Sequence, residues 1–193
     1  MFHRIRFSDK VEVPPQLLGS GVEDAVRESL RNSYEGRIDE DLGSVVSILS
    51  VEDIGDGEIK PEEAGAFYPV TCDAITYIPE LHEVVLGEVS EITEFGAFVS
   101  LGPLEALCHV SQIMDDYVSY NEDQGVLSGE DGDRILKQGD VVKARITAVS
   151  LSDEDDHKVN LTMRQPGLGK LEWIEEDVEE AKEEEEEGGE NSG

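Results

Sequence analysis

The chain has 193 residues, enough for one domain or two small ones with modest cores, and its 46 acids against 15 bases give a net charge of -31. Such a charge, taken alone, argues against partners that carry many phosphates, because like charges repel. No stretch approaches the ~20 apolar residues that span a bilayer, and the N-terminal segment lacks the apolar core of a signal peptide, so a cytoplasmic protein is expected.

Residues 1–80 are expected to form a small α+β domain. Apolar residues alternate over residues 3–13, which predicts a strand, and two prolines end it. A helix is expected over residues 20–34, where a Ser-x-x-Glu capping box precedes apolar residues at helical spacing. Two further strands, "SVVSILSVEDI" and "FYPVTCDAITYI", are separated by a long polar turn.

Residues 81–174 are expected to form a five-stranded β-barrel of the OB type. Between Gly-rich turns lie five strand-like runs: 83–93, 96–101, 105–110, 140–150 and 157–163. The long polar segment before the fourth run predicts a short helix and then a mobile loop. Residues 175–193 are of low complexity and very acidic, which predicts a disordered tail. The predicted fold class is therefore α+β, with an N-terminal α+β domain, a barrel and a tail.

The acidity extends through the whole chain. Without its acidic C-terminus, residues 1–171 still hold 34 acids against 14 bases, a net charge of -20. Two interpretations are open: an acidic protein that binds basic partners, or the surface of a halophile's protein, on which carboxylates hold water. The spread of acids over loops, turns and helix faces favours the halophile. In molar salt the Debye length is about 3 Å, so the net charge then does not exclude local contacts with nucleic acid.

The cysteines and histidines show no pattern of a metal site. Cys72 and Cys108 lie in apolar strand-like runs without a Cys-x-x-Cys partner, which predicts buried free thiols rather than a disulfide or a metal site. The four histidines are not at ligand spacing. Hydrolysis of phosphodiesters would need a carboxylate cluster or an activated base, and no such motif is present. We expect a non-catalytic protein without metal or cofactor.

Two phenylalanines form the most informative short motif. Phe95 and Phe98 are three positions apart around Gly96, whereas neighbours on one face of a strand are two apart. A bulge or a sharp coil at Gly96 would bring both rings to one side. An exposed pair of rings can stack on unpaired bases, each worth ~1–3 kcal/mol. The alternative is that one or both rings belong to the core.

The stretch "LGEVSEITEFGAFVSLGPLEALCHVSQI" resembles the S1 RNA-binding domain family, over roughly residues 82–165. The resemblance implies that Phe95, Phe98 and His109 face RNA. Many S1 domains place an Asp and a basic residue near the turn between the fourth and fifth strands. Here Ser150 stands at the Asp position, a departure from the family, and Lys158 supplies the base.

Basic residues are few, and several lie in the barrel half. Lys143 and Arg145 alternate with apolar residues on the fourth strand, so they point outward and either meet phosphates or serve as general surface charge. The same half holds Lys137, Lys158 and Arg164. We count Lys143, Arg145 and Lys158 among the candidate RNA-binding residues.

The whole chain resembles the larger stalk subunit of archaeal DNA-directed RNA polymerase. The segments that carry the resemblance are "VEVPPQLLG", "YEGRIDEDLGSVVSILSVEDIGDGEI", "VTCDAITYIPELHEVV", "SQIMDDYVSY" and "LTMRQPGLGKLEWIEE", in this order. The family implies a ribonucleoprotein-like N-terminal domain that docks on the polymerase core through a tip at residues 54–70. It also implies a heterodimer with the smaller stalk subunit and an S1 barrel that meets the single-stranded transcript. The docking candidates are Gly55, Gly57, Ile59, Pro61 and Phe67.

Two other classes of protein carry similar barrels. An S1-domain RNA-binding subunit of an exosome, or a translation factor, should have different domains beside the barrel, and the N-terminal segments quoted above speak against both. A nuclease with an S1 appendage should show a catalytic carboxylate motif. The sequence therefore favours a non-catalytic polymerase subunit with a docking domain over residues 1–80, an RNA-binding domain over 81–174 and an acidic tail over 175–193.

Overall fold

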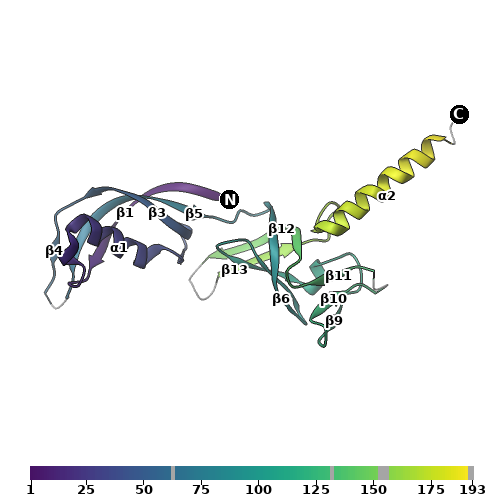
Figure 1. Cartoon of the computed structure of the whole chain (residues 1–193), viewed down its shortest axis with the longest axis horizontal. Coiled ribbons are helices and arrows are strands. Elements are labelled where there is room, and N and C mark those ends of the chain that lie inside the picture. Colours follow the sequence, from purple (N-terminus) through teal and green to yellow (C-terminus); the bar gives the residue numbers. More distant parts are fainter. Residues whose placement is uncertain (62–63, 131–132, 152–156, 191–193) are drawn as a thin grey trace. The chain divides into compact units, whose positions relative to one another are not determined.

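A computed structural model describes residues 1–61, 64–130, 133–151 and 157–190 of the chain (Figure 1). These residues form two compact units, of which the first begins with Met1–Pro79 and the second with Glu80–Val149. The second unit resumes at Lys158, while Ser150, Leu151 and His157 group with the first. Across the described ranges, no helix combines the length and the apolar character that crossing a membrane requires.

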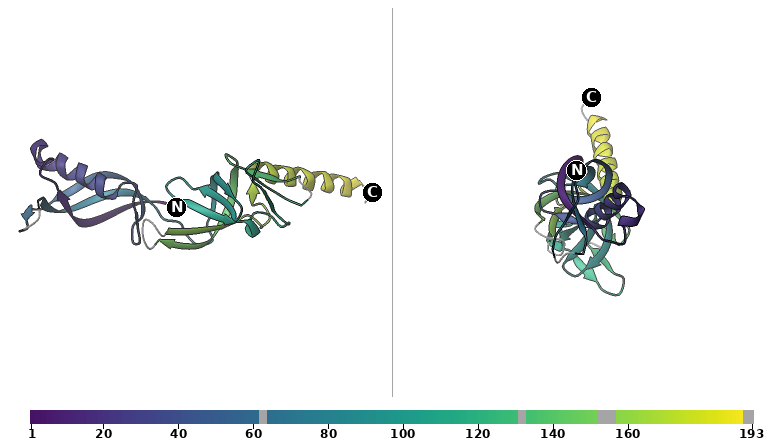
Figure 2. Two further views of the ribbon diagram at one scale, coloured as in Figure 1. Left: turned by 90° about the horizontal axis from the view of Figure 1, so that it is seen from below. Right: turned by 90° about the vertical axis from the view of Figure 1, so that its left-hand side faces the viewer.

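The first unit is an antiparallel sheet with one helix packed on a face (Figure 2). Its elements are β1 (Phe2–Val13), α1 (Val22–Tyr34), β2 (Ile38–Asp39), β3 (Gly43–Ile54), β4 (Glu58–Ile59) and β5 (Ala66–Tyr77). The strand order is β1-β5-β3-β2, and β4 pairs with β5. The three long strands and the helix confirm the α+β organisation expected from the apolar alternation.

The core of this unit lies between α1 and the sheet. Ala25, Val26 and Leu30 of α1 are buried against alternate residues of the three long strands, among them Val13, Val45 and Cys72. At ~25 cal/mol per Å² of apolar surface, burial of such side chains supplies most of the stabilisation. Cys72 is a buried free thiol, as is Cys108 in the second unit, and both predictions are confirmed.

The predicted capping box is wrong. The helix begins at Val22 after a 3-10 turn (Leu18–Ser20), and its N-cap is not Ser20 but Gly21, a residue that has no side chain to accept a capping hydrogen bond. Gly21 has φ +98°, a left-handed backbone that only glycine adopts easily, so the chain turns into the helix there. Glu23 and Asp24 in the first turn favour the positive end of the helix dipole.

Asp73 on β5 is a buried carboxylate held by two arginines. It is only 2% exposed, and it accepts hydrogen bonds from Arg6 Nε and Arg4 Nη2, both at 2.6 Å. The hydrogen bond from Arg6 has the largest effect and the hydrogen bond from Arg4 the next largest, and together they lower the pKa of Asp73 to about 2. Because this pKa is below the unfolded value of about 3.9, the ionised carboxylate stabilises the fold above pH about 4, and this is lost as pH falls toward 2.

Asp73→Asn is therefore expected to be less stable than the parent at neutral pH, with a difference that shrinks as the pH falls below about 4. Urea unfolding of both proteins, followed by circular dichroism at a series of pH values, measures this difference. A difference that stays constant from neutral pH to pH about 3 would show that the ion pair does not determine it.

The second unit is built around a closed barrel. Its barrel strands are β6 (Val84–Thr93), β7 (Gly96–Ser100), β8 (Glu105–His109), β12 (Val141–Leu151) and β13 (His157–Thr162). The sheet order is β13-β8-β7-β6-β12-β14, and an additional pairing of β13 with β12 closes the ring. These strands correspond to the five expected runs. A further short strand, β14 (Gly169–Lys170), pairs with β12 outside the ring.

The segment between β8 and β12 differs from the prediction. A 3-10 turn (Val110–Gln112) is followed by a small sheet of β9 (Ser119–Asn121), β10 (Val126–Ser128) and β11 (Ile135–Lys137), in the order β11-β10-β9. The expected short helix and mobile loop are therefore wrong for the described residues; residues 131–132 lie outside them. The cause is burial, because Leu127 and Leu136 are both fully buried and face each other across β10 and β11.

The acidic C-terminus is helical where disorder was expected. Helix α2 runs over Leu171–Glu190, and only residues 191–193 of the predicted tail lie outside the described part. Trp173 is 5% exposed and anchors the first turn to the barrel unit, while Arg134 lies 5.8 Å from its ring and pairs with Asp177. Glu, Ala and Lys are strong helix formers, so an anchored first turn can propagate.

Candidate nucleic-acid interface

Phe95 and Phe98 lie side by side on the outside of the barrel. Phe95 occupies the two-residue turn between β6 and β7 and is 46% exposed, while Phe98 projects from β7 between the buried Ala97 and Val99. The ring centroids are 6.0 Å apart with an interplanar angle of 89°, an edge-to-face contact. The turn thus solves the problem of the three-residue spacing, because the first ring is not on the strand.

Gly96 makes this arrangement possible. Its φ is +153°, and a Cβ added there would lie 2.2 Å from the carbonyl oxygen of Cys108. The expected bulge lies elsewhere, since the register shift between β6 and β7 is between Val89 and Glu91. The close approach at Gly96 instead holds β7 against the end of β8, where His109 pairs with Gly96.

His109 is exposed at the end of β8, beside the phenylalanine turn. The backbone N–H of Val110 donates to the carbonyl oxygen of Phe95 at 2.8 Å, which ties the turn to this strand end. The backbone N–H of Ser111 donates to Nδ1 of His109 at 3.2 Å, and Ser111 Oγ lies 2.9 Å from the same nitrogen. Because Nδ1 accepts, the neutral ring carries its proton on Nε2, a donor suited to a phosphate or a base.

Lys158 lies on the same outer face. Phe98 is opposite Leu107 on β8, and Leu107 is in turn opposite Asn160 on β13. Lys158 precedes Asn160 by two residues, so both side chains point to the same side of the barrel wall, and Lys158 is exposed. The predicted basic residue therefore lies on β13, two strands away from Phe98 on β7, on the same outer face of the barrel.

Lys143 and Arg145 are not brought to the phenylalanines. Lys143 on β12 is opposite Leu86 of β6, whereas Phe98 is opposite Glu91. Five residues along a strand correspond to about 16 Å. Arg145 is opposite Val84, two residues further from the phenylalanines, and donates from Nη1 to the carbonyl oxygen of His82 at 3.3 Å.

Arg164 is a basic residue of the site that the candidate set did not include. Its Nη1 donates to the carbonyl oxygen of Ser111 at 3.3 Å, and Ser111 also contacts His109. The guanidinium pairs with the carboxylate of Asp115. The sequence showed Arg164 only as one of several bases in this half, because its proximity to His109 depends on long-range packing of the chain after β13 against the 3-10 turn.

The aromatic face is bordered by acids. Glu91 is the cross-strand neighbour of Phe98, and Glu94 directly precedes Phe95 in the turn; both are exposed. Carboxylates here repel phosphates, so base stacking rather than general attraction must supply much of any affinity for RNA. In the described ranges, no three His, Cys, Asp or Glu side chains gather as a possible metal site.

The docking candidates lie around the β4 hairpin of the first unit. Ile59 is 81% exposed, and β4 pairs with β5 through Glu58 opposite Phe67. Lys60 Nζ lies 4.0 Å from the centre of the Phe67 ring. Pro61 is also exposed, and residues 62–63 lie outside the described part.

The two glycines of the tip permit close packing. A Cβ at Gly55 would meet Cγ of Pro69 at 2.6 Å, and a Cβ at Gly57 would meet the ring of Tyr68 at 2.6 Å. The chain between β3 and β4 therefore lies directly on β5. This hairpin exposes Ile59, a large apolar side chain.

Comparisons with known proteins assign both units. Residues 78–164 match the family described as S1 RNA binding domain, and residues 8–64 match the SHS2 domain found in N terminus of Rpb7p/Rpc25p/MJ0397. The chain is 34% identical to DNA-directed RNA polymerase subunit Rpo7 of Sulfolobus acidocaldarius, over 94% of this chain and 99% of that protein. Rpo7 of Saccharolobus shibatae is 38% identical over 90% of this chain and 97% of its own length. DNA-directed RNA polymerase III subunit RPC8 of Saccharomyces cerevisiae is 29% identical over 52% of this chain and 48% of that protein.

Proposed function

The chain belongs to the Rpo7 family and is a stalk subunit of DNA-directed RNA polymerase, and we propose that its two units divide the work of docking and RNA binding. The first unit docks on the polymerase core, and the second holds the single-stranded transcript as it leaves the enzyme. The chain pairs with the smaller stalk subunit and has no catalytic role of its own. Its place is the cytoplasm of an archaeal cell, where it supports transcription initiation and elongation.

The observation that carries the RNA-binding role is the aromatic pair beside His109. Two rings in contact, one of them 46% exposed, form a surface on which bases can stack. His109 and Arg164 lie at the same end of the barrel and supply hydrogen-bond donors for the phosphate backbone of the RNA. Residues 78–164, which match the S1 RNA binding domain, contain this whole constellation.

Purification of the tagged chain from its host in high salt tests the assignment. The polymerase core subunits and the smaller stalk subunit are expected to accompany it in fixed proportion. Co-purification of exosome or ribosomal proteins in their place would contradict it.

Ile59→Asp is expected to weaken association with the polymerase core without loss of stability. The side chain is 81% exposed in the first unit, so its apolar surface is available to a partner and a charge there would have to be buried on docking. Deletion of Gly57 to Ala64 should have the same effect and leave the barrel and its RNA binding intact. Both are measured by reconstitution of the polymerase and gel filtration.

Val22→Asp is the matched control for this test. Val22 is another exposed apolar residue of the same unit, 44% exposed at the first position of α1, where an acid is well tolerated. It should assemble like the parent. If the Ile59 variant and the deletion also assemble fully, the hairpin is only a surface loop.

The acidic surface supports the proposal of a halophilic host. With -20 on residues 1–171 alone, repulsion within the folded chain is severe in dilute buffer. The thermal midpoint of unfolding should rise steeply from dilute buffer to molar KCl, because salt screens that repulsion. Sucrose is the control, since it stabilises by exclusion without screening charge. A midpoint that is flat in KCl would refute the halophile proposal.

A further inference from the structure

Helix α2 carries an apolar heptad seam, of which the first two residues are half-buried and the last two are exposed. Leu171, Ile174, Val178 and Ala181 follow one another at spacings of three, four and three residues, the pattern of a and d positions in a coiled coil. On a helix these four side chains form one narrow stripe about 15 Å long. Trp173, by which the helix is anchored, lies on a different side.

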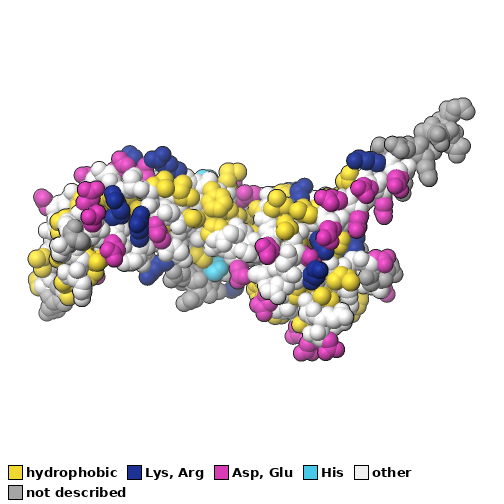
Figure 3. Space-filling model, in the orientation of Figure 1, with side chains coloured by type: hydrophobic (Ala, Val, Ile, Leu, Met, Phe, Trp, Pro, Cys, Tyr) yellow, Lys and Arg dark blue, Asp and Glu magenta, His cyan; other side chains and the backbone are white. Residues whose placement is uncertain are grey.

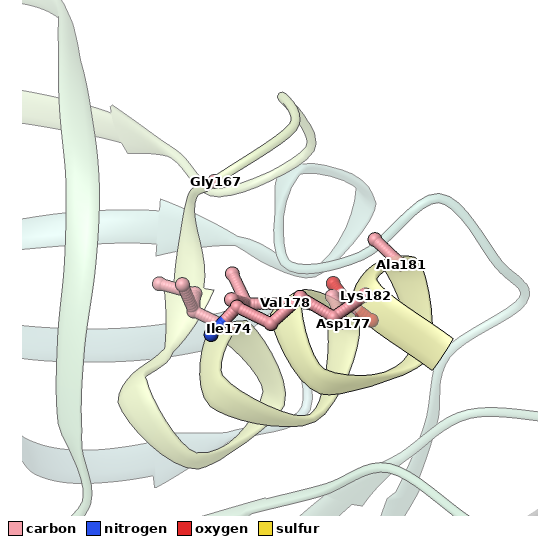
Figure 4. Close-up of a pocket in the computed structure, with 6 residues that line it drawn as sticks. All are labelled: Gly167, Ile174, Asp177, Val178, Ala181 and Lys182. Carbon is pink, nitrogen blue, oxygen red and sulfur yellow. The ribbon is translucent and has the colours of Figure 1, made fainter. Parts of the chain in front are cut away.

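An open hollow lies along this stripe (Figure 4). Its volume is about 260 Å³, and its lining residues are Gly167, Ile174, Asp177, Val178, Ala181 and Lys182. Val178 is 47% exposed at its centre, and Gly167 in the turn before β14 forms the opposite wall. A coiled-coil partner places its own a and d side chains into hollows of this kind, between four residues of the facing helix.

The charges beside the seam determine what can fill it. Residues 171–183 contain seven acids and one base, Lys182. Figure 3 shows acidic side chains along the visible face of the described part of α2. Among the e and g positions next to the seam, where interhelical ion pairs form, Glu175 and Asp177 are acidic and Lys182 is basic, and Asp177 already pairs with Arg134. A second copy of α2 would bring acids against acids, whereas a basic helix would pair with them.

We propose that α2 docks an amphipathic helix of a partner protein, with an apolar a/d stripe that packs on the seam of Leu171, Ile174, Val178 and Ala181 and with Lys or Arg at its e and g positions. The apolar seam supplies the attraction, and the flanking acids select the partner by charge. This binding mode is a helix in a groove, distinct from the aromatic face of the barrel.

Two synthetic helical peptides test the proposal on the full-length chain. One has leucine at a and d and lysine at e and g; the other has glutamate at e and g and is otherwise identical. Fluorescence anisotropy, in a salt concentration at which circular dichroism shows the chain folded, measures binding. The lysine peptide should bind at least about tenfold more tightly than the glutamate peptide.

Two variants of the chain test whether the lysine peptide binds at the seam. Val178→Asp puts a charge at the centre of the seam and should weaken binding of the lysine peptide at least about tenfold. Glu176→Gln, which changes the outer side of the same helix, should bind within about twofold of the parent and corrects for a general change of charge. Both residues are exposed, so both variants should remain folded.

Three results would overturn the proposal. The first is no binding of the lysine peptide, or equal binding of both peptides. The second is binding that Val178→Asp leaves unchanged, which would show general attraction to the acidic surface. The third is a dimer of the chain alone in analytical ultracentrifugation that Val178→Asp dissociates, since a second copy would then be the occupant.

Discussion

Replacing Phe95 and Phe98 together by alanine is expected to weaken binding of single-stranded RNA by roughly 2–4 kcal/mol, which corresponds to about 30- to 1000-fold in Kd. Each ring can stack on one base, and the two rings contact each other edge to face at 6.0 Å, so loss of one also loosens the other. Neither ring is part of the fully buried core, so the double variant should remain folded.

Salt separates stacking from phosphate contacts. Affinity from phosphates falls with salt at a slope of about -0.7 per neutralised phosphate on single strands, whereas stacking depends far less on charge. Glu91 and Glu94 beside the rings weaken the phosphate term further. The phenylalanines should therefore carry a larger share of the affinity than in most RNA-binding proteins, and this share should grow as the salt rises.

Variants of the other candidate residues rank their contributions to RNA binding. Replacing Lys143 and Arg145 by Gln should cost less than the double phenylalanine change, because Lys143 is about 16 Å along the strand from Phe98 and Arg145 is further still. His109→Ala should weaken RNA binding less than the double phenylalanine change and more than the change of Lys143 and Arg145, because the ring can stack on a base or donate through Nε2. Fluorescence anisotropy in molar KCl measures all of them, with circular dichroism as the folding control. A folded double variant that binds like the parent would show that the rings do not contact RNA.

Gly96→Ala is expected to destabilise the barrel by more than about 3 kcal/mol. The backbone conformation at φ +153° is strained for any side chain, and the new Cβ would lie 2.2 Å from the carbonyl oxygen of Cys108, a backbone atom that can move only with β8. The movement would displace His109, so RNA binding should fall as well. Urea unfolding measures the stability, and anisotropy measures the binding.

Gly102→Ala is the matched control, because it shares the strain but not the clash. Gly102 has φ +97°, and no atom lies within 4 Å of its added Cβ. It should cost only about 1–2 kcal/mol, the cost of the backbone conformation alone. Equal destabilisation by the two substitutions would show that the contact with β8 is not tight.

The long elements were predictable because their side chains are periodic. Alternation over residues 3–13 gave β1, and helical spacing gave α1 up to Tyr34. The three strands β9, β10 and β11 have three residues each, too few for any period to show, and they exist because Leu127 and Leu136 are buried together. Helix α2 was missed because composition does not reveal that Trp173 anchors its first turn.

The aromatic rings of the site could be predicted from the sequence, but the charged residues that lie beside them could not. The glycine between Phe95 and Phe98 indicated an unusual backbone, and the structure gives Gly96 a φ of +153° directly after the turn. Which basic residues lie near the rings depends on strand pairing, which a single sequence does not show. Lys158 is on the same outer face as the rings, while Lys143 and Arg145 are opposite the other end of β6. Arg164 reaches Ser111 through a contact 53 residues apart in the chain.

A photoreactive phenylalanine at position 95 in reconstituted polymerase tests the RNA-binding role most directly. Halted elongation complexes with labelled transcripts of increasing length should crosslink to this position once the transcript is long enough to leave the enzyme. The control position is Leu86, which is 62% exposed on β6 and lies five residues along the strand from the cross-strand neighbour of Phe98, so it should crosslink more weakly than position 95. Absence of a crosslink at position 95 for every transcript length, in a polymerase that contains the chain, would contradict the proposal that this face of the barrel holds the emerging RNA.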